Sequence, residues 1–307
     1  MNLKSKRILI TGGHGFLGTN LVEDLNKSGY YNLITPTSKE CNLTELQDIA
    51  LLFEQARPNV VIHLAGKVGG IQDNLDAPGE FFFDNLIMGS QLLDQARKWS
   101  VDKFIIVGSA CMYPSNIASP FKEEDLWLGY PNNDTAPYGM AKKVLLVQSQ
   151  AYRKQYNFNS VCLILTNMYG EHDKSSHVIP MLVTKFLDAV KYNKKEVVIW
   201  GTGHETRDFL YVKNATSAII AALENYNSSE PINIGSGDET SIKSIVELIT
   251  KLTGYTGNIL YDTSKPSGVL RRCLDITRAH RELRWLNMIT LEEGINNTIN
   301  YLRGRIA

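Results

Sequence analysis

The feature that most constrains the fold is segment 7–18, in which a short apolar run leads directly into three evenly spaced glycines. Residues 7–11 read Arg-Ile-Leu-Ile-Thr, an apolar and β-branched run that predicts a buried strand. Residues 19–28 then have the apolar spacing of a helix, with Gly29 as its stop. Small residues between a strand and a helix permit a tight turn and let backbone amides approach a pyrophosphate. The loop residues expected at a dinucleotide are Gly12, Gly13, His14, Gly15, Phe16, Leu17 and Gly18.

Strand-like and helix-like segments alternate along the first half of the chain. Further strands are expected at residues 33–35, 60–63, 104–107 and 161–165. The helical segments between them are expected at residues 43–56, 81–99 and 138–156. Because this alternation builds parallel sheets covered on both faces, it predicts an α/β protein with a Rossmann-type, doubly wound parallel sheet.

The pattern changes after about residue 169, where the segments become shorter and more mixed. Helices are expected at residues 178–190, 212–225, 242–253 and 291–302, with strands at 197–199 and 232–234. We therefore expect a nucleotide-binding Rossmann domain in residues 1–170. Residues 171–307 are expected to form a smaller α/β substrate lobe, interleaved with the first.

The amino-acid composition limits the kinds of partner that the chain is expected to bind. Lys plus Arg and Asp plus Glu both number 32, and this zero net charge argues against a nucleic-acid-binding surface. No apolar run approaches the ~18 residues of a membrane span, and the N-terminus has no signal-peptide core. The four cysteines match neither a disulfide framework nor a metal site, so a reducing, cytoplasmic setting without a metal is expected.

Three residues have the chemistry of carbonyl reduction. Tyr138 and Lys142 are four apart in a helical segment and so share a face. An ammonium beside a phenol lowers the phenol pKa, which lets the tyrosine exchange a proton with a carbonyl oxygen near neutral pH. Ser109 follows the strand at 104–107, at the sheet edge where sites of open α/β folds lie. A Tyr-x-x-x-Lys is common by chance, but together with the glycine loop and the serine it predicts an oxidoreductase.

The second strand indicates which dinucleotide is bound. NAD-specific loops place an acidic residue at the end of this strand, whereas residues 35–40 read Thr-Pro-Thr-Ser-Lys-Glu. Ser38 and Lys39 fit a 2′-phosphate, with help from His14, and we expect NADP (NADPH). In the alternative, Lys39 is a solvated charge and Glu40 binds the ribose.

These residues lie in strings that resemble the extended short-chain dehydrogenase/reductases, and within them the GDP-L-fucose synthase family of GDP-4-keto-6-deoxy-D-mannose epimerase-reductases. The resemblance covers nearly the whole chain. Its strings are residues 67–71, 108–114, 138–142, 166–173, 176–180, 207–212 and 264–266. The Val-Gly-Gly, Ser-x-Cys and His-Val-Ile-Pro strings are much more specific than the glycine loop.

The resemblance implies roles for further residues. Cys111 matches the base and His177 the acid that invert C3 and C5 of a GDP-linked 4-keto sugar, before NADPH reduces C4. A buried apolar thiol and a surface histidine are the plain alternatives for these two residues.

Additional cofactor contacts are implied at Ala65, Gly108, Tyr138, Lys142 and Asn167. Substrate contacts are implied at Val68, Gly69, Gly70, Ser109, Asn167, His177, Lys185, Trp200, Arg207 and Lys265. The plain alternatives are core packing for Trp200 and a solvated helix charge for Lys185. The family also implies a homodimer built from the helices at 81–99 and 138–156.

Departures from the family strings keep other functions open. Ser267 replaces an acidic residue, Leu165 replaces a proline, and segment 172–177 is short. A reductase of GDP-6-deoxy-4-keto-heptose, with or without epimerisation, is therefore the alternative substrate reading. A 4,6-dehydratase is disfavoured because its usual Asp-Glu pair is replaced by Ala110 and Cys111. A catalytically dead NADP-binding protein is disfavoured because Ser, Tyr and Lys are all present.

Overall fold

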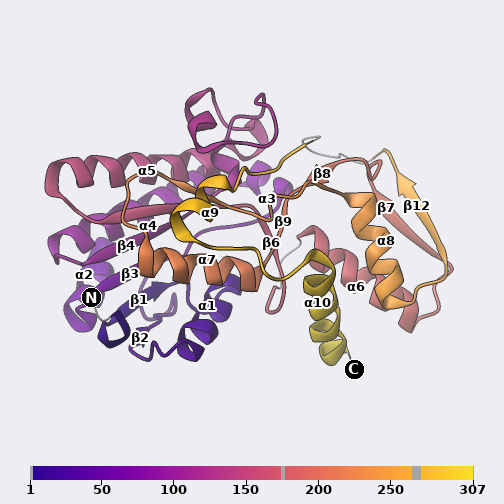
Figure 1. Ribbon diagram of the computed structural model, residues 1–307, viewed down its shortest axis with the longest axis horizontal. Helices are drawn as coiled ribbons and strands as arrows, with labels where there is room; N and C mark the ends of the chain where they lie inside the picture. The colour runs from indigo at the N-terminus through magenta and orange to yellow at the C-terminus, as the bar shows by residue number, and fades with distance from the viewer. Residues whose placement is uncertain (1–2, 174–176, 265–270, 307) are drawn as a thin grey trace.

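The computed structural model describes residues 3–173, 177–264 and 271–306 and is built around a six-stranded sheet (Figure 1). The order of its strands is β10-β5-β4-β3-β1-β2, and every neighbouring pair is parallel. The strands are β1 (Ile8–Thr11), β2 (Leu33–Ile34), β3 (Val60–His63), β4 (Lys103–Ser109), β5 (Ser160–Leu165) and β10 (Ile232–Ile234). The expected Rossmann-type α/β fold is confirmed.

Helices cover both faces of the sheet because alternate strand residues point to opposite sides. Ile8 and Ile10 pack with α1 (Phe16–Lys27) and α7 (Val212–Asn225), in the larger of two buried clusters. Leu9 packs in the other cluster, with α2 (Leu46–Ala56), α4 (Pro78–Lys98) and α5 (Ala136–Tyr156). Each fully buried aliphatic side chain contributes roughly 1.5–3 kcal/mol, so the two layers hold the strand ends in fixed positions.

Three helices, α1, α4 and α5, begin earlier than predicted because small or cyclic residues lie at their starts. Gly15 is the N-cap of α1, so the glycine loop runs into the first helical turn at Phe16 rather than at residue 19. Pro78 occupies the first turn of α4, where its missing N–H costs nothing. The start of α1 therefore lies directly at the carboxyl end of β1.

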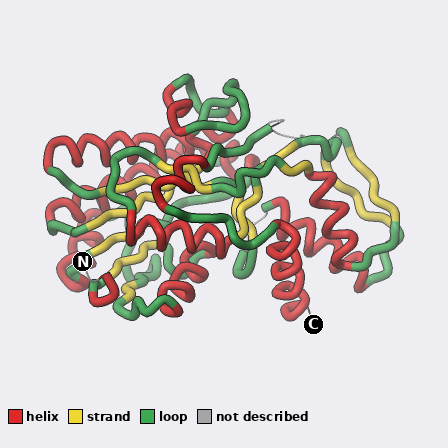
Figure 2. Tube along the Cα trace, in the orientation of Figure 1, coloured by secondary structure: helices red, strands yellow, loops and turns green. Residues whose placement is uncertain are grey.

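A second group of elements forms a smaller lobe, seen to the right in Figures 1 and 2. It contains α6 (Val178–Lys191), β7 (Glu196–Trp200), α8 (Ile242–Thr253), β12 (Asn258–Asp262) and α10 (Leu291–Ile306). Strand β12 pairs with β7 in parallel. The chain returns from this lobe to the central sheet, where β10 pairs with β5 and α9 (Thr277–Leu283) follows. The division at residue 170 stays a prediction.

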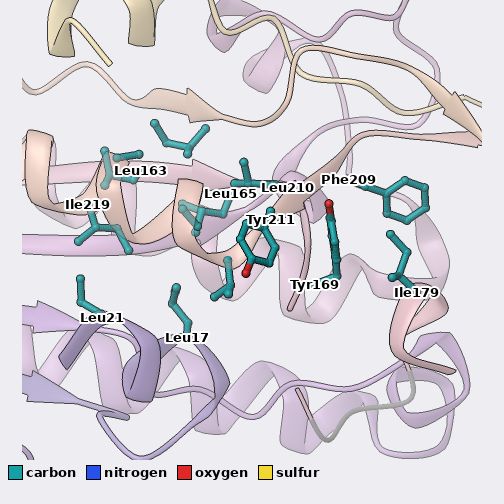
Figure 3. Packing of buried hydrophobic residues seen from close by; sticks show 14 of the residues in the cluster. Leu17, Leu21, Leu163, Leu165, Tyr169, Ile179, Phe209, Leu210, Tyr211 and Ile219 are labelled. Atoms are coloured by element: carbon teal, nitrogen blue, oxygen red, sulfur yellow. The ribbon is translucent and has the colours of Figure 1, made fainter. Parts of the chain in front are cut away.

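Short strands connect the two parts of the molecule. Strand β6 (Asn167–Tyr169) pairs with β9 (Phe209–Tyr211) in parallel, and β8 (Thr206–Arg207) pairs with β11 (Thr240–Ser241) in the antiparallel sense. The rings of Tyr169 and Tyr211 lie 5.6 Å apart, between Leu165 of the sheet and Ile179 of α6 (Figure 3). One apolar core therefore continues from the sheet into the second lobe. Among the described residues, no helix has the length and apolarity needed to cross a membrane.

Candidate active site

The carboxyl end of β4 carries the predicted serine and cysteine on one tight turn. Ser109 ends the strand, and a single 3-10 turn, η2 (Ala110–Met112), follows it at once. The backbone N–H of Cys111 donates to Ser109 Oγ at 3.2 Å. Both side chains are partly exposed, while Ala110 and Met112 are buried and anchor the turn. The hydroxyl and the thiol therefore lie at the same strand end with fixed backbone geometry.

Helix α5 brings Tyr138 to this turn. A Cβ atom at Gly139 would lie 2.2 Å from the carbonyl oxygen of Cys111, so only glycine permits the observed approach. Tyr138, one residue earlier, interacts with both Ser109 and Cys111. The Lys142 Nζ lies 5.9 Å from the centroid of the Tyr138 ring. The structure thus brings together Ser109, Cys111, Tyr138 and Lys142, while their chemical roles stay predictions.

The electrostatics of this cluster differ from the sequence expectation. Burial raises the pKa of Tyr138 above its ordinary value, the nearby Cys111 raises it further, and the hydrogen bond with Ser109 opposes both. Burial lowers the pKa of Lys142, which is 3% exposed, to about 8. The expected lowering of the phenol pKa by Lys142 is therefore wrong for this arrangement, because desolvation outweighs the charge. Tyr138 is held as a neutral phenol, a proton donor.

Two residues around Lys142 were missed by sequence reasoning. His63 ends β3, forms a 2.8 Å hydrogen bond with Thr11 through Nδ1, and has its pKa lowered to about 3 by burial and by the charge of Lys142. Asn85 of α4 donates to the carbonyls of Phe81 and Lys67, while its Oδ1 is buried and has no hydrogen-bond partner in the part of the chain that the structure describes. The sequence predicts that His63 ends a strand and that Asn85 lies in a helix, but no short motif links either residue to Lys142.

The glycine loop has the shape of a phosphate cradle. Gly12 has φ +73°, and a Cβ there would lie 2.7 Å from the backbone N of Ala65. A Cβ at Gly18 would lie 2.0 Å from the carbonyl oxygen of Gly12. The loop therefore packs tightly on the ends of β1 and β3, and Gly15 caps α1 without a side chain over its first amides. The residues present fit a dinucleotide pyrophosphate.

The segment after β2 favours a phosphate-bearing ribose. His14 Nε2 is hydrogen-bonded to the carbonyl oxygen of Thr35 at 2.8 Å, which fixes the ring beside the strand end. Glu40 accepts from both the N–H and the hydroxyl of Thr37, at 2.7 and 2.8 Å. Its carboxylate thus closes its own turn, while the neighbouring Ser38 and Lys39 are exposed. This geometry supports the 2′-phosphate interpretation over the alternative in which Glu40 binds the ribose.

Val68, Gly69 and Gly70, the residues predicted to line the sugar pocket, are held partly by contacts with the start of the next helix. Val68 is 65% exposed, and the N–H of Gly70 donates to Asp73 at 2.7 Å, where α3 (Ile71–Asp76) begins. A Cβ at Gly69 would lie 2.7 Å from the Asp73 side chain. Gly69 is therefore required by the start of α3, in addition to any approach of a ligand.

Three of the predicted contact residues lie on β6, α6 and β7. Trp200 ends β7 and is 64% exposed, so the alternative of core packing is wrong. Lys185 Nζ donates to the carbonyl of Val198 on the same strand. Asn167 donates to the carbonyl of Asp208 at 3.3 Å. Lys265 lies outside the described residues.

His177 is the N-cap of α6, and its Nδ1 lies 3.4 Å from Asp173 Oδ2. Its side chain is 43% exposed, whereas that of Asp173 is fully buried. A buried carboxylate beside an exposed imidazole is a common way to orient a proton-transfer histidine. Its pairing with Cys111 stays a prediction.

Arg272 is a further residue at the site that sequence reasoning missed. Its Nη1 lies 3.8 Å from Cys111 Sγ, across 161 residues of sequence. Burial, and then the charge of Arg272, lower the pKa of the neighbouring Arg207 to about 10. A motif search has no signal for this contact because the two segments meet only in the folded chain.

A parallel sheet with a glycine cradle at β1 and a Ser-Tyr-Lys cluster at β4 defines a dinucleotide-dependent enzyme of the extended short-chain dehydrogenase class. The chain belongs to the NAD dependent epimerase/dehydratase family, whose profile matches residues 8–235. This confirms the resemblance of the sequence strings and shows that the chain is an enzyme.

The relatives handle nucleotide sugars. The chain is 35% identical over 309 residues to a GDP-L-fucose synthase of Sinorhizobium fredii, covering 99% of this chain and 98% of the relative. It is 35% identical over 302 residues to a GDP-L-colitose synthase of Yersinia pseudotuberculosis, covering 96% and 97%. A solved structure of MlghC, a GDP-mannoheptose C4 reductase from Campylobacter jejuni with NADP bound, superimposes with a TM-score of 0.91. It is 29% identical, with 98% of this chain and 99% of that chain covered.

Proposed function

We propose that this protein converts GDP-4-keto-6-deoxy-D-mannose to GDP-L-fucose, by epimerising C3 and C5 and then reducing C4 with NADPH. The observation that carries the proposal is the placement of a thiol, Cys111, on the same turn as Ser109 and against Tyr138. A carbonyl reductase needs the serine, tyrosine and lysine, whereas the thiol adds a base for the carbons beside the carbonyl. The relatives named above share a GDP-linked sugar, which supports the substrate class.

The first stage is proton transfer at carbons made acidic by the C4 carbonyl. The thiolate of Cys111 removes the proton from C3 or C5. The electron pair of that C–H bond forms a C=C bond to C4, and the π pair of the carbonyl moves to the C4 oxygen. Ser109 and Tyr138 donate hydrogen bonds to this oxygen and stabilise the resulting enolate. An acid, assigned to His177, returns a proton on the opposite face. Asp173 would keep the imidazole oriented for this step.

The second stage uses the same oxygen. Bound NADPH supplies the hydride that reduces C4. Tyr138, kept protonated by its burial, gives its proton to the C4 oxygen as the alcohol forms. Lys142 places positive charge 5.9 Å from the ring centroid, where it stabilises the phenolate left behind. The cradle of Gly12, Gly15 and Gly18 would hold the pyrophosphate, and His14, Ser38 and Lys39 the 2′-phosphate.

A second candidate is reduction at C4 of a GDP-6-deoxy-4-keto-heptose. The structural likeness to MlghC, at a TM-score of 0.91, favours it. The two candidates differ in the sugar and in the need for Cys111, so one assay separates them. NADPH oxidation at 340 nm is followed with each 4-keto sugar, and the product is identified by NMR. We expect GDP-L-fucose from the hexose; turnover of the heptose alone would contradict the first candidate.

We also propose a homodimer built from α4 and α5. Large apolar side chains remain exposed on these helices at Phe82, Phe83, Val144 and Val147. Such a row is typical of a helix face that is covered by a partner. Light scattering is expected to give the mass of two chains, falling to one in Val147→Asp. A wild-type mass of one chain would contradict the dimer.

The cellular setting is proposed to be the reducing cytoplasm. Cys41, Cys111, Cys162 and Cys273 are all free thiols.

A further inference from the structure

The C-terminal segment that enters the site is anchored at Arg272 and at the two residues that follow it. The N–H of Asp208 donates to the carbonyl of Arg272 at 2.9 Å. The carbonyl of Cys273 accepts from Phe121 at 2.8 Å, and Leu274 is 1% exposed. The backbone at residue 272 is therefore fixed, so its side chain starts from a defined position.

The side chain of Arg272 is directed at the thiol. Its Nη1 lies 3.8 Å from Cys111 Sγ, and its Nε is buried with no hydrogen-bond partner among the described residues. Among the residues that the structure describes, no carboxylate forms an ion pair with Arg272, whereas the neighbouring Arg207 interacts with the charge of Glu205. Of these two guanidinium groups, that of Arg272 is the one that lies against the thiol.

The adjacent Arg271 differs from Arg272 because a carboxylate pairs with its charge. Arg271 is exposed and binds both oxygens of Glu239, at 2.7 and 2.6 Å. Its charge is therefore neutralised away from the site. Of the two consecutive arginines, Arg272 alone keeps its charge beside Cys111.

We propose that Arg272 is a positioning residue for Cys111, which holds the sulfur in place and stabilises its thiolate for proton abstraction. This inference rests on the proposed function. The thiol first loses its proton to water, and the anionic sulfur is held by the guanidinium. When the sulfur takes the proton from C3 or C5, the C–H bond breaks and an S–H bond forms. The negative charge moves to the C4 oxygen, where Ser109 and Tyr138 receive it.

The first test needs no sugar. Carboxamidomethylation of Cys111 by iodoacetamide at pH 7.5 is timed by peptide mass spectrometry in the wild-type enzyme, Arg272→Gln, Arg272→Lys and Arg271→Gln. The other three cysteines are at most 4% exposed, which keeps the reading specific. We expect Arg272→Gln to slow alkylation about tenfold, Arg272→Lys to recover most of the rate, and Arg271→Gln to match the wild type. Equal rates in all four proteins would overturn the proposal.

The second test separates positioning from substrate binding. In Arg272→Gln, deuterium exchange at C3 and C5 is expected to fall about tenfold with the substrate KM nearly unchanged, and to be restored in Arg272→Lys. A raised KM with unchanged alkylation and exchange would instead assign Arg272 to the diphosphate and overturn the thiolate role. A wild-type enzyme without exchange would refute the epimerase function, while the alkylation rates would still decide whether Arg272 acts on Cys111.

Discussion

Gly139 of α5 lies against the carbonyl oxygen of Cys111, so close that a Cβ atom would stand 2.2 Å from it. This contact connects the helix that carries Tyr138 and Lys142 to the turn that carries Ser109 and Cys111. The relative positions of the proton donor for C4 and of the base for C3 and C5 therefore depend on this one contact between the helix and the turn.

Replacing Gly139 by alanine should damage both chemical steps. The added methyl group meets backbone rather than a flexible side chain, so α5 has to move away from η2. We expect a loss of stability of about 1–3 kcal/mol and a fall in kcat of tenfold or more. Thermal unfolding and the 340 nm assay measure the two effects.

Gly304→Ala is the matched control, because Gly304 lies on α10 with no neighbour within 4 Å of an added Cβ. It should leave activity unchanged and leave stability equal or raised by about 0.5–1 kcal/mol. Normal activity in Gly139→Ala would show that the contact does not position the site.

Lys142→Met should make the protein more stable at pH 7 while abolishing reduction. Burial lowers the Lys142 pKa from 10.5 to about 8, so the folded state holds an unfavourable buried charge below that pH. Removing it is expected to add on the order of 3 kcal/mol. Between pH 8 and 10.5 the unfolded chain keeps a proton at Lys142 that the folded chain has lost, so wild-type stability rises with pH. The gain in Lys142→Met should shrink across this window in denaturant titrations.

Lys103→Met is the comparison for that experiment. The pKa of Lys103 is also lowered to about 8 by burial, but its ammonium donates to the carbonyls of Ala222 and Leu223 at 2.7 and 2.8 Å. Its loss leaves two buried acceptors unsatisfied, so this variant should be destabilised. Equal destabilisation in both variants would show that Lys142 is also held by strong hydrogen bonds.

Lys39→Ala should weaken the binding of NADPH but not the binding of NADH. Lys39 is exposed in the segment after β2, and it is expected to contact only the 2′-phosphate. Loss of one charge-assisted contact corresponds to about a tenfold rise in the KM for NADPH, with the KM for NADH unchanged. Ser228, on the surface near α7, provides a neutral control as Ser228→Ala. A parallel rise for both cofactors would contradict a phosphate-specific role.

Tyr138→Phe should stop reduction without unfolding the protein. The raised pKa of the phenol keeps its proton available at neutral pH, and phenylalanine has no proton to give. We expect hydride transfer to fall by about 10²–10⁴, while fluorescence titration shows NADPH binding at wild-type strength. A rate near that of the wild type would place the proton donor elsewhere.

The sequence was informative wherever a function depended on local spacing. The strand before Gly12, the strand before Ser109 and the four-residue step from Tyr138 to Lys142 each use short-range geometry, and all three were located correctly. Element ends were less certain, because Gly15 as an N-cap and Pro78 in a first turn move helix starts.

What the sequence could not predict are contacts between distant segments. Strand β10 was expected from its apolar run, but its pairing with β5 depends on the whole topology. The strands β6, β8, β9, β11 and β12 and the helices α3 and α9 were not predicted, because each is short and stabilised by a neighbour rather than by its own pattern. Arg272 reaches Cys111 across 161 residues, and the burial that raises the Tyr138 pKa exists only in the folded chain.

The central claim is that one site both epimerises and reduces, and deuterium incorporation tests it most directly. The enzyme is incubated with GDP-4-keto-6-deoxy-D-mannose in D₂O, with and without NADPH, alongside Cys111→Ser. We expect deuterium at C3 and C5 without NADPH, GDP-L-fucose labelled at both carbons with NADPH, and loss of exchange in Cys111→Ser. NADPH oxidation to a product that carries no deuterium at C3 or C5 would contradict it and leave a C4 reductase.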